Sequence, residues 1–185
     1  LPVILSTGFA DAAAAQGGSI NMIAMAGLVL AIIGVCFKIA AVPMHFYTPD
    51  VYQGASAAIA GFLAFVPKTA GFFAIMLLIS AVGWRFGESG QALPGVIRDI
   101  LFALAVGTMT VGNVLAILQT SVKRILAYSS IAHSGYMLVG IIAGPGRPGT
   151  AGADAPAFAS NGLAAVLFYL LSYGVMTIGA FAVLA

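Results

Sequence analysis

The sequence predicts an all-α fold of the membrane type, a polytopic bundle of about five transmembrane helices. Of the 185 residues, 62% are hydrophobic and only 6% are charged, whereas soluble globular chains carry about 25% charged residues. Apolar stretches of roughly 20 residues recur, which is the length that crosses a bilayer as a helix. β-barrel strands would be about 10 residues long with alternating polarity, and these segments have neither property.

The predicted spans form a single transmembrane domain, residues 1–185. They cover about 20–42, 56–82, 100–118, 125–143 and 158–185. Residues 1–19 are interpreted as the remnant of an earlier helix and its loop, so we expect a fragment, a processed chain or one part of a split protein. "GWRFGESGQALPG" is typical of an interfacial loop with an aromatic anchor, and "GPGRPGTAGADAPA" of an irregular surface loop.

Several classes of protein are excluded by what the sequence lacks. The single cysteine, Cys36, lies within a span, so this chain alone builds neither a disulfide nor an iron–sulfur or Cys-based metal site. We interpret Cys36 as a small packing residue. There is no phosphate loop, dinucleotide fingerprint or hydrolase elbow. The basic residues are scattered rather than clustered, which gives no indication of a nucleic-acid partner.

Three ionisable residues fall at membrane depth. Lys38 is near the end of the first span, Lys68 is near the centre of the second, and His133 is within the fourth. Insertion of a lysine at a helix centre costs roughly 2.5 to 3.5 kcal/mol, so such residues usually face a bundle interior or water and often mark ion pathways. Because desolvation disfavours the charged form, a buried lysine can exchange a proton.

Each of these residues also has a structural interpretation. Lys38 is close enough to a span end to extend its ammonium to the headgroups. Lys68 is about a dozen residues from either end of its span, so its ammonium does not easily reach the headgroups. A purely structural role stays open for it as well. His133 is equally well explained by an interhelical hydrogen bond. His45, beside Pro43 at the helix exit, suits a solvated or capping role at least as well as proton transfer.

Two prolines lie next to the lysines. Pro67 directly precedes Lys68 and removes one backbone hydrogen bond from its helix, which predicts a local hydrated defect beside the ammonium. Pro43 follows Lys38 after five residues and predicts a break in the first helix. Interrupted helices that line a cavity are common in transporters. The alternative is a plain kink that adjusts packing.

Two blocks of sequence resemble a known family. "FKIAAVPMHFYTPDVYQGA" (37–55) and "GNVLAILQTSVKRILAYSSIAHSGYMLVGI" (112–141) are similar to subunit N of respiratory complex I, the proton-pumping NADH:quinone oxidoreductase. The mitochondrial counterpart of that family is NADH dehydrogenase subunit 2. "AFVPKTAGFF" lies between the blocks, where the family carries a lysine. "TPDVYQGA" favours subunit N over its sibling subunits and over multisubunit cation/proton antiporters.

The resemblance assigns roles to individual residues. It implies that Lys38 is the lysine of a broken helix in a proton channel, Lys68 its partner on the next helix, and His133 a member of a central hydrophilic axis. Lys123, in the second block, is a further supporting candidate. Pro43, Pro67 and His45 are supporting candidates because of their places beside the lysines, and Pro67 departs from the family pattern, in which a small or polar residue is expected before the lysine. In such subunits protons move through water wires and these side chains, driven by quinone chemistry elsewhere in the complex.

The resemblance also implies partners and a location. No cofactor is expected in this chain, because FMN, the iron–sulfur clusters and quinone belong to other subunits of the complex. The expected partners are the other membrane-arm subunits, including any chain that supplies missing helices, together with the lipid bilayer. The expected location is the energy-coupling membrane, the bacterial or mitochondrial inner membrane.

The chain departs from the family pattern in its acidic residues. The family's key glutamate lies on an earlier helix and a further lysine on a later one, and this chain contains neither. All of its acidic residues fall in predicted loops or at span edges: Asp11, Asp50, Glu88, Asp99 and Asp154. Two alternatives therefore stay open. One is a subunit of a multisubunit cation/proton antiporter, and the other is a membrane-arm piece that packs against its neighbours without pumping.

Overall fold

The computed structural model describes residues 22–82, 85–87, 90–93, 95–145 and 161–185. Six helices dominate, which confirms the all-α class. Their bounds are α2 Met22–Lys38, α3 Thr48–Gly54, α4 Ala57–Val82, α5 Gly95–Ile117, α6 Val122–Ala143 and α7 Gly162–Val183. Two short antiparallel strands, β1 Arg85–Gly87 and β2 Gly90–Ala92, lie in the segment expected as an interfacial loop. The predicted remnant over 1–19 lies outside the described residues, as does most of the predicted loop after α6.

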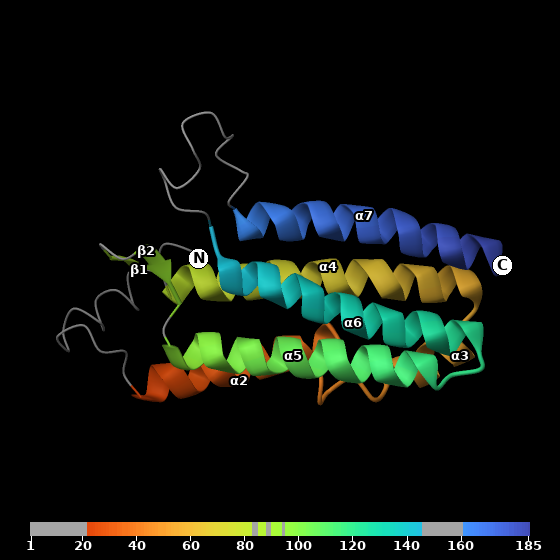
Figure 1. Cartoon of the computed structure of the whole chain (residues 1–185), viewed down its shortest axis with the longest axis horizontal. Coiled ribbons are helices and arrows are strands. Elements are labelled where there is room, and N and C mark those ends of the chain that lie inside the picture. Colours follow the sequence, from red (N-terminus) through yellow and green to blue (C-terminus); the bar gives the residue numbers. More distant parts are fainter. Residues whose placement is uncertain (1–21, 83–84, 88–89, 94, 146–160) are drawn as a thin grey trace.

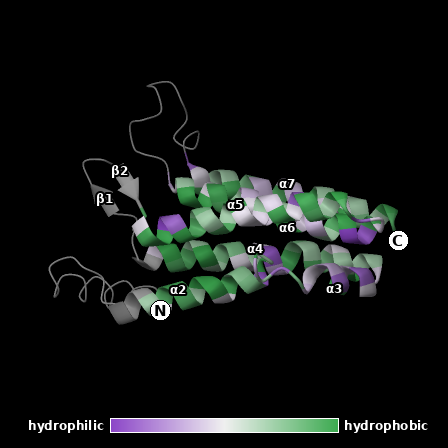
Figure 2. Ribbon diagram, turned by 60° about the horizontal axis from the view of Figure 1, so that its bottom comes forward, coloured by the Kyte–Doolittle hydropathy of each residue, from purple (hydrophilic) through white to green (hydrophobic). Residues whose placement is uncertain are grey.

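The helices run along one common axis, with the β1–β2 hairpin at one end of the bundle and α3 at the other (Figure 1). α5 packs along α6, α2 packs on α4, and α7 contacts both α4 and α6. α4, α5, α6 and α7 are long and apolar enough to cross a membrane. Figure 2 shows that hydrophobic colour covers much of these helices, while α6 is paler.

The bundle is apolar outside and carries polar side chains inside. Large hydrophobic side chains face outwards, for example Phe168 at 72% and Phe102 at 61% exposure. In contrast, Thr108 and Ser134 are completely buried. Lipid tails are as apolar as leucine, so outward-facing hydrophobic residues are expected in a bilayer. The protein is therefore an integral membrane protein whose polar groups are turned inwards.

The first predicted span ends earlier than expected. The span was predicted to reach residue 42, but α2 ends at Lys38. There the amide of Ala41 donates to the carbonyl of Cys36 (2.9 Å) and the amide of Ala40 to that of Phe37 (3.2 Å). This is the Schellman pattern, in which the residue after the cap adopts a left-handed conformation. Ala40 has φ = 58°, a conformation that costs a non-glycine residue roughly 1–2 kcal/mol.

The break after α2 is compensated by side chains from two other helices. Residues 39–47 form turns rather than a helix, which leaves backbone groups that need partners inside a membrane protein. The amide of Val42 donates to Oγ1 of Thr108 on α5 (3.0 Å), and the hydroxyl of Ser134 on α6 donates to the carbonyl of Ile39 (2.9 Å). The predicted broken helix is thus confirmed, with α2 and α3 as its two halves beside α4 (Figure 1).

The other helices begin away from the predicted limits. α5 begins at Gly95 rather than at 100, and α6 begins at Val122 rather than at 125. The predicted limits followed the apolar stretch alone, whereas Arg98 and Asp99 form an exposed ion pair within the first turns of α5. Charged residues are tolerated there, since long side chains near helix ends reach the interface. α7 begins at Gly162, with the Asn161 side chain accepting hydrogen bonds from two amides.

We expect Thr108→Val to destabilise the break. Valine has nearly the same shape, but the partly buried Val42 amide would lose its acceptor, which costs up to about 1–3 kcal/mol. Thr110→Val is the matched control, because Thr110 lies on the same helix and is exposed. Thermal unfolding of the full-length protein in detergent measures both. Equal unfolding temperatures for the two variants would contradict the role given to Thr108.

Candidate functional site

Lys68 lies at the centre of the bundle. Its side chain leaves α4, and the residue is 2% exposed. The Nζ ammonium donates to the backbone carbonyl of Ser130 and to the hydroxyl of Ser134 (2.9 Å), both on α6. It also lies 5.9 Å from the centre of the Tyr173 ring on α7. These partners are neutral, so the buried charge has hydrogen bonds but no carboxylate beside it among the described residues.

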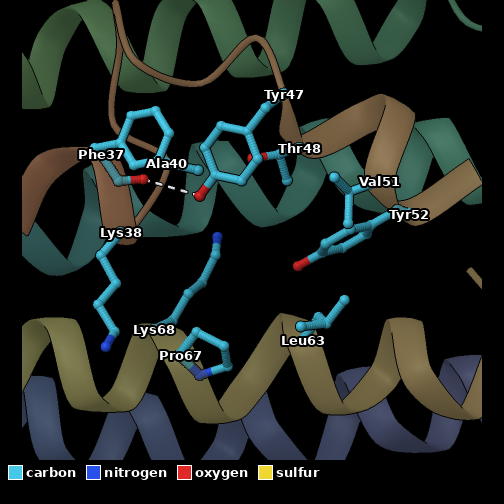
Figure 3. Close-up of a pocket in the computed structure, with 10 residues that line it drawn as sticks. All are labelled: Phe37, Lys38, Ala40, Tyr47, Thr48, Val51, Tyr52, Leu63, Pro67 and Lys68. Atoms are coloured by element: carbon cyan, nitrogen blue, oxygen red, sulfur yellow. Dashed lines mark hydrogen bonds between the residues drawn. The ribbon is translucent and has the colours of Figure 1, made fainter.

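Pro67 opens space next to this lysine. α4 remains helical through Pro67, yet proline has no N–H, so the carbonyl of Leu63 loses its helical partner. Both residues line a cavity of about 390 Å³ between α4 and the broken helix (Figure 3). Lys38 and Lys68 also line it, and Figure 3 shows the two lysines entering from opposite walls.

Lys38 is placed differently from Lys68. It is the last residue of α2, and it is exposed in this chain. No hydrogen bond or ion pair joins its side chain to the rest of the described structure. Beside it, the stacked rings of Phe37 and Tyr47 lie 4.8 Å apart, and the Tyr47 hydroxyl donates to the carbonyl of Phe37 (2.8 Å). The break in the helix therefore presents Lys38 at the edge of the cavity.

His133 lies near Lys68 and shares Tyr173 with it as a neighbour. It is half-buried on α6, next in sequence to Ser134. Its Nδ1 atom and the hydroxyl of Tyr169 are 2.6 Å apart. The ring of Tyr173 lies 5.0 Å from the ring of His133, centre to centre. The structure thus places Lys38, Lys68 and His133 in one region of the bundle, and their roles stay predictions.

The two supporting basic residues lie apart from each other. His45 is in the non-helical segment, where its Nδ1 atom is buried without a hydrogen-bond partner in the described part of the chain. Lys123 lies in the first turn of α6 and donates to the carbonyl of Ala55, the residue that caps α3 (2.9 Å). Next to it, Arg124 pairs with Asp50 on α3 (3.0 Å). Lys123 therefore holds α3 in place, and no described hydrogen bond joins it to Lys38 or Lys68.

Sequence reasoning missed the polar side chains that surround Lys68 and His133. Ser130 and Ser134 are four residues apart on α6, so they share one helix face. Tyr169, Tyr173 and Thr177 repeat this spacing on α7. The two polar stripes were visible as breaks in apolar spans. Which stripe faces which lysine was not visible, because that depends on how the helices pack.

This arrangement can bind and release protons. A buried ammonium with neutral partners is costly to keep charged, so its neutral form becomes accessible. The hydroxyl groups around it can accept and donate hydrogen bonds in either state. Within the described residues no cluster of His, Cys, Asp or Glu could hold a metal ion. The site is therefore a set of titratable groups with hydroxyl groups next to Lys68 and His133.

A broken helix facing a buried lysine in an apolar bundle defines an antiporter-like membrane protein. The chain belongs to the NADH:quinone oxidoreductase/Mrp antiporter transmembrane family, whose family model matches residues 5–185.

Curated relatives agree with this assignment and are named NADH-quinone oxidoreductase subunit N. The relative from Beutenbergia cavernae is 46% identical over 86% of this chain and 26% of its own length. The relative from Trichlorobacter lovleyi is 43% identical over 91% of this chain and 30% of its own length. The relative from Mycobacterium tuberculosis is 44% identical over 95% of this chain and 29% of its own length. The resemblance to subunit N is confirmed, and the chain spans less than a third of the length of these relatives.

Solved structures show the same fold. A chain of respiratory complex I from Thermus thermophilus with bound aureothin matches 99% of this chain and 38% of its own length, with 32% identity and a TM-score of 0.63. A chain of the Mrp complex from a Dietzia species matches 97% of this chain and 30% of its own, with a TM-score of 0.68. At 20% identity, the second likeness shows the fold alone.

Proposed function

We propose that this chain is part of a membrane-arm subunit of a proton-pumping NADH:quinone oxidoreductase. In this role it contributes buried basic residues to a proton path coupled to electron transfer from NADH to quinone. The observation that carries the proposal is Lys68, which is 2% exposed and bonded only to neutral groups of α6 among the described residues. A purely structural residue at this position would be less costly if it were apolar.

The path that we propose runs from Lys38 through the cavity beside Pro67 to Lys68, and then towards His133. The cavity of about 390 Å³ is lined by both lysines, and its volume is enough for several water molecules at about 30 Å³ each. Water is needed there because no hydrogen bond joins Lys38 to Lys68 in the described residues. His133 and its tyrosine neighbours continue the polar region beyond Lys68.

The proposal includes partners but no cofactor in this chain. FMN, the iron–sulfur clusters and quinone would be bound by other subunits of the complex. The partners would be the other membrane-arm subunits and the segments of the full-length subunit that flank this chain. The complex would lie in the energy-coupling membrane.

Purification of the complex by an affinity tag on the full-length chain tests this function. We expect the tag to recover a complex that contains flavin and iron–sulfur signals and that reduces quinone with NADH. Recovery of a complex without redox centres, which exchanges protons for cations in vesicles, would replace the proposal by the antiporter alternative. Recovery of a redox complex that does not pump protons would favour a structural membrane-arm piece.

A further inference from the structure

Tyr173 is a buried neighbour of both Lys68 and His133. It lies on α7 and is 3% exposed. Its ring centre is 5.9 Å from the Lys68 ammonium and 5.0 Å from the centre of the His133 ring. No other aromatic ring among the described residues is recorded next to both groups. The ring of Tyr173 is therefore a neighbour that Lys68 and His133 share.

The hydroxyl of Tyr173 has no hydrogen-bond partner among the described residues. The hydroxyls of Ser130 and Thr177 are its polar neighbours. Buried hydroxyls are normally hydrogen-bonded to protein or to ordered water. A position surrounded by three hydroxyls also supplies the two to four polar contacts that a buried water molecule requires. The Tyr173 hydroxyl is thus suited to bind a water molecule beside the lysine.

The direct partners of Lys68 cannot pass a proton towards His133. The carbonyl of Ser130 accepts a hydrogen bond but has no proton to give. The Ser134 hydroxyl donates to the backbone carbonyls of Ile39 (2.9 Å) and Ser130 (3.2 Å), so its proton is directed to backbone acceptors and not to His133. Both partners hold the ammonium without connecting it to His133. A transfer between the two residues needs another group that can accept and donate.

We propose that Tyr173 is a relay residue whose hydroxyl, with a water molecule bound to it, transfers protons between Lys68 and His133. This inference rests on the proposed function. An N–H bond of the Lys68 ammonium breaks as an O–H bond forms on the relay oxygen, and another O–H bond of the relay breaks as an N–H bond forms on the His133 ring. Lys68 becomes neutral, His133 becomes positive, and no electron moves. The Nδ1 atom of His133 already has Tyr169 as its partner, which leaves Nε2 as the accepting atom.

The test compares three variants of the full-length chain in the assembled complex. Tyr173→Phe removes the hydroxyl but keeps the ring next to Lys68 and His133, and Tyr173→Leu removes both. Thr69→Val is the control, because it also deletes a hydroxyl beside Lys68, but one that donates to the Phe65 carbonyl of its own helix (2.9 Å). Quinone-linked NADH oxidation, proton uptake into vesicles and the solvent deuterium isotope effect are measured for each.

We expect Tyr173→Phe to lower coupled turnover roughly 10-fold, at the low end for a proton-transfer group because a second water molecule can replace part of the phenol. The solvent isotope effect should rise, since proton transfer becomes rate-limiting, and a merely structural residue would not change it. Tyr173→Leu should lower turnover further. NADH oxidation with an artificial acceptor should be unchanged in all three variants, and Thr69→Val should behave as wild type.

Wild-type pumping and an unchanged isotope effect in Tyr173→Phe would overturn the relay. A Tyr173→Phe variant that fails to assemble would also overturn it, because the hydroxyl would then be required for folding. Failure of this inference differs from failure of the proposed function. If Lys68→Ala abolishes pumping while Tyr173→Phe pumps normally, the function stands without the relay. If Lys68→Ala pumps normally, the proposed function is contradicted, and the relay with it.

Discussion

Replacement of Lys68 by alanine is expected to remove most coupled turnover and proton pumping from the assembled complex. The loss should be at least about 10-fold, since a positioned proton-transfer group typically contributes 10²- to 10⁴-fold. Lys68 is 2% exposed and is bonded to α6 through two hydrogen bonds, so no neighbouring described residue can take its place. Quinone-linked NADH oxidation and proton uptake into vesicles measure the effect. Oxidation with an artificial acceptor should persist, because the redox centres would be bound by other subunits. Co-purification with the tagged chain shows that the complex has assembled.

Lys68→Arg separates charge from proton exchange. A guanidinium keeps the positive charge and can donate hydrogen bonds to Ser130 and Ser134, but it stays protonated under all conditions found in proteins. We therefore expect the arginine variant to assemble and still fail to pump. An arginine variant that pumps like wild type would show that only a fixed charge is needed. An alanine variant that pumps normally would make Lys68 a structural residue.

Under the proposed function, the proton affinity of Lys68 has to change during a pumping cycle. Moving one charge against the membrane potential requires roughly 2.3 kcal/mol per 100 mV, so a lysine with constant affinity could only conduct. A nearby carboxylate would favour the ammonium, and its withdrawal would favour the neutral amine. In the described structure the ion pairs involve Arg98 with Asp99 and Arg124 with Asp50. Neither of these carboxylates is paired with Lys68 in the described residues.

The second large effect is expected at Gly112, where α5 and α6 approach closely. A Cβ atom added at Gly112 would lie 2.7 Å from the backbone nitrogen and 3.0 Å from Cα of Ala132. Backbone atoms cannot move aside as the end of a side chain can, so the two helices would have to separate. We expect Gly112→Ala to destabilise the protein by about 1–3 kcal/mol through overpacking. Separation would also displace the Ser130 and Ser134 partners of Lys68 on α6.

Gly107→Ala is a matched control with the opposite expected sign. Gly107 lies on the same helix, and an added Cβ would make one ordinary contact at 3.9 Å with Val42. Alanine is favoured over glycine inside a helix by about 1 kcal/mol. We therefore expect Gly107→Ala to raise the unfolding temperature of the full-length protein in detergent and Gly112→Ala to lower it. Equal shifts would show that close packing of α5 and α6 does not limit stability.

Much of the fold could be predicted because hydropathy is a local property. A run of apolar residues long enough to cross a bilayer reports a helix without knowledge of its neighbours, and α4 over Ala57–Val82 lies close to the predicted span over 56–82. The end of α2 was misplaced because apolar residues continue through the break. Its position depends on Thr108 and Ser134, which supply hydrogen bonds to the interrupted backbone. These residues lie on helices distant in sequence.

The candidate site also has one part that the sequence determines and another that depends on the tertiary structure. The sequence by itself determined that Lys68 sits at membrane depth beside Pro67, because its distance from both span ends is fixed by residue number and helix rise. Only the tertiary structure decided what meets that lysine. Ser130 and Ser134 come from α6, 62 and 66 residues further along the chain, and Tyr173 comes from α7. Pairing of helices and their rotation about their axes depend on side-chain packing across the bundle, which no single span encodes.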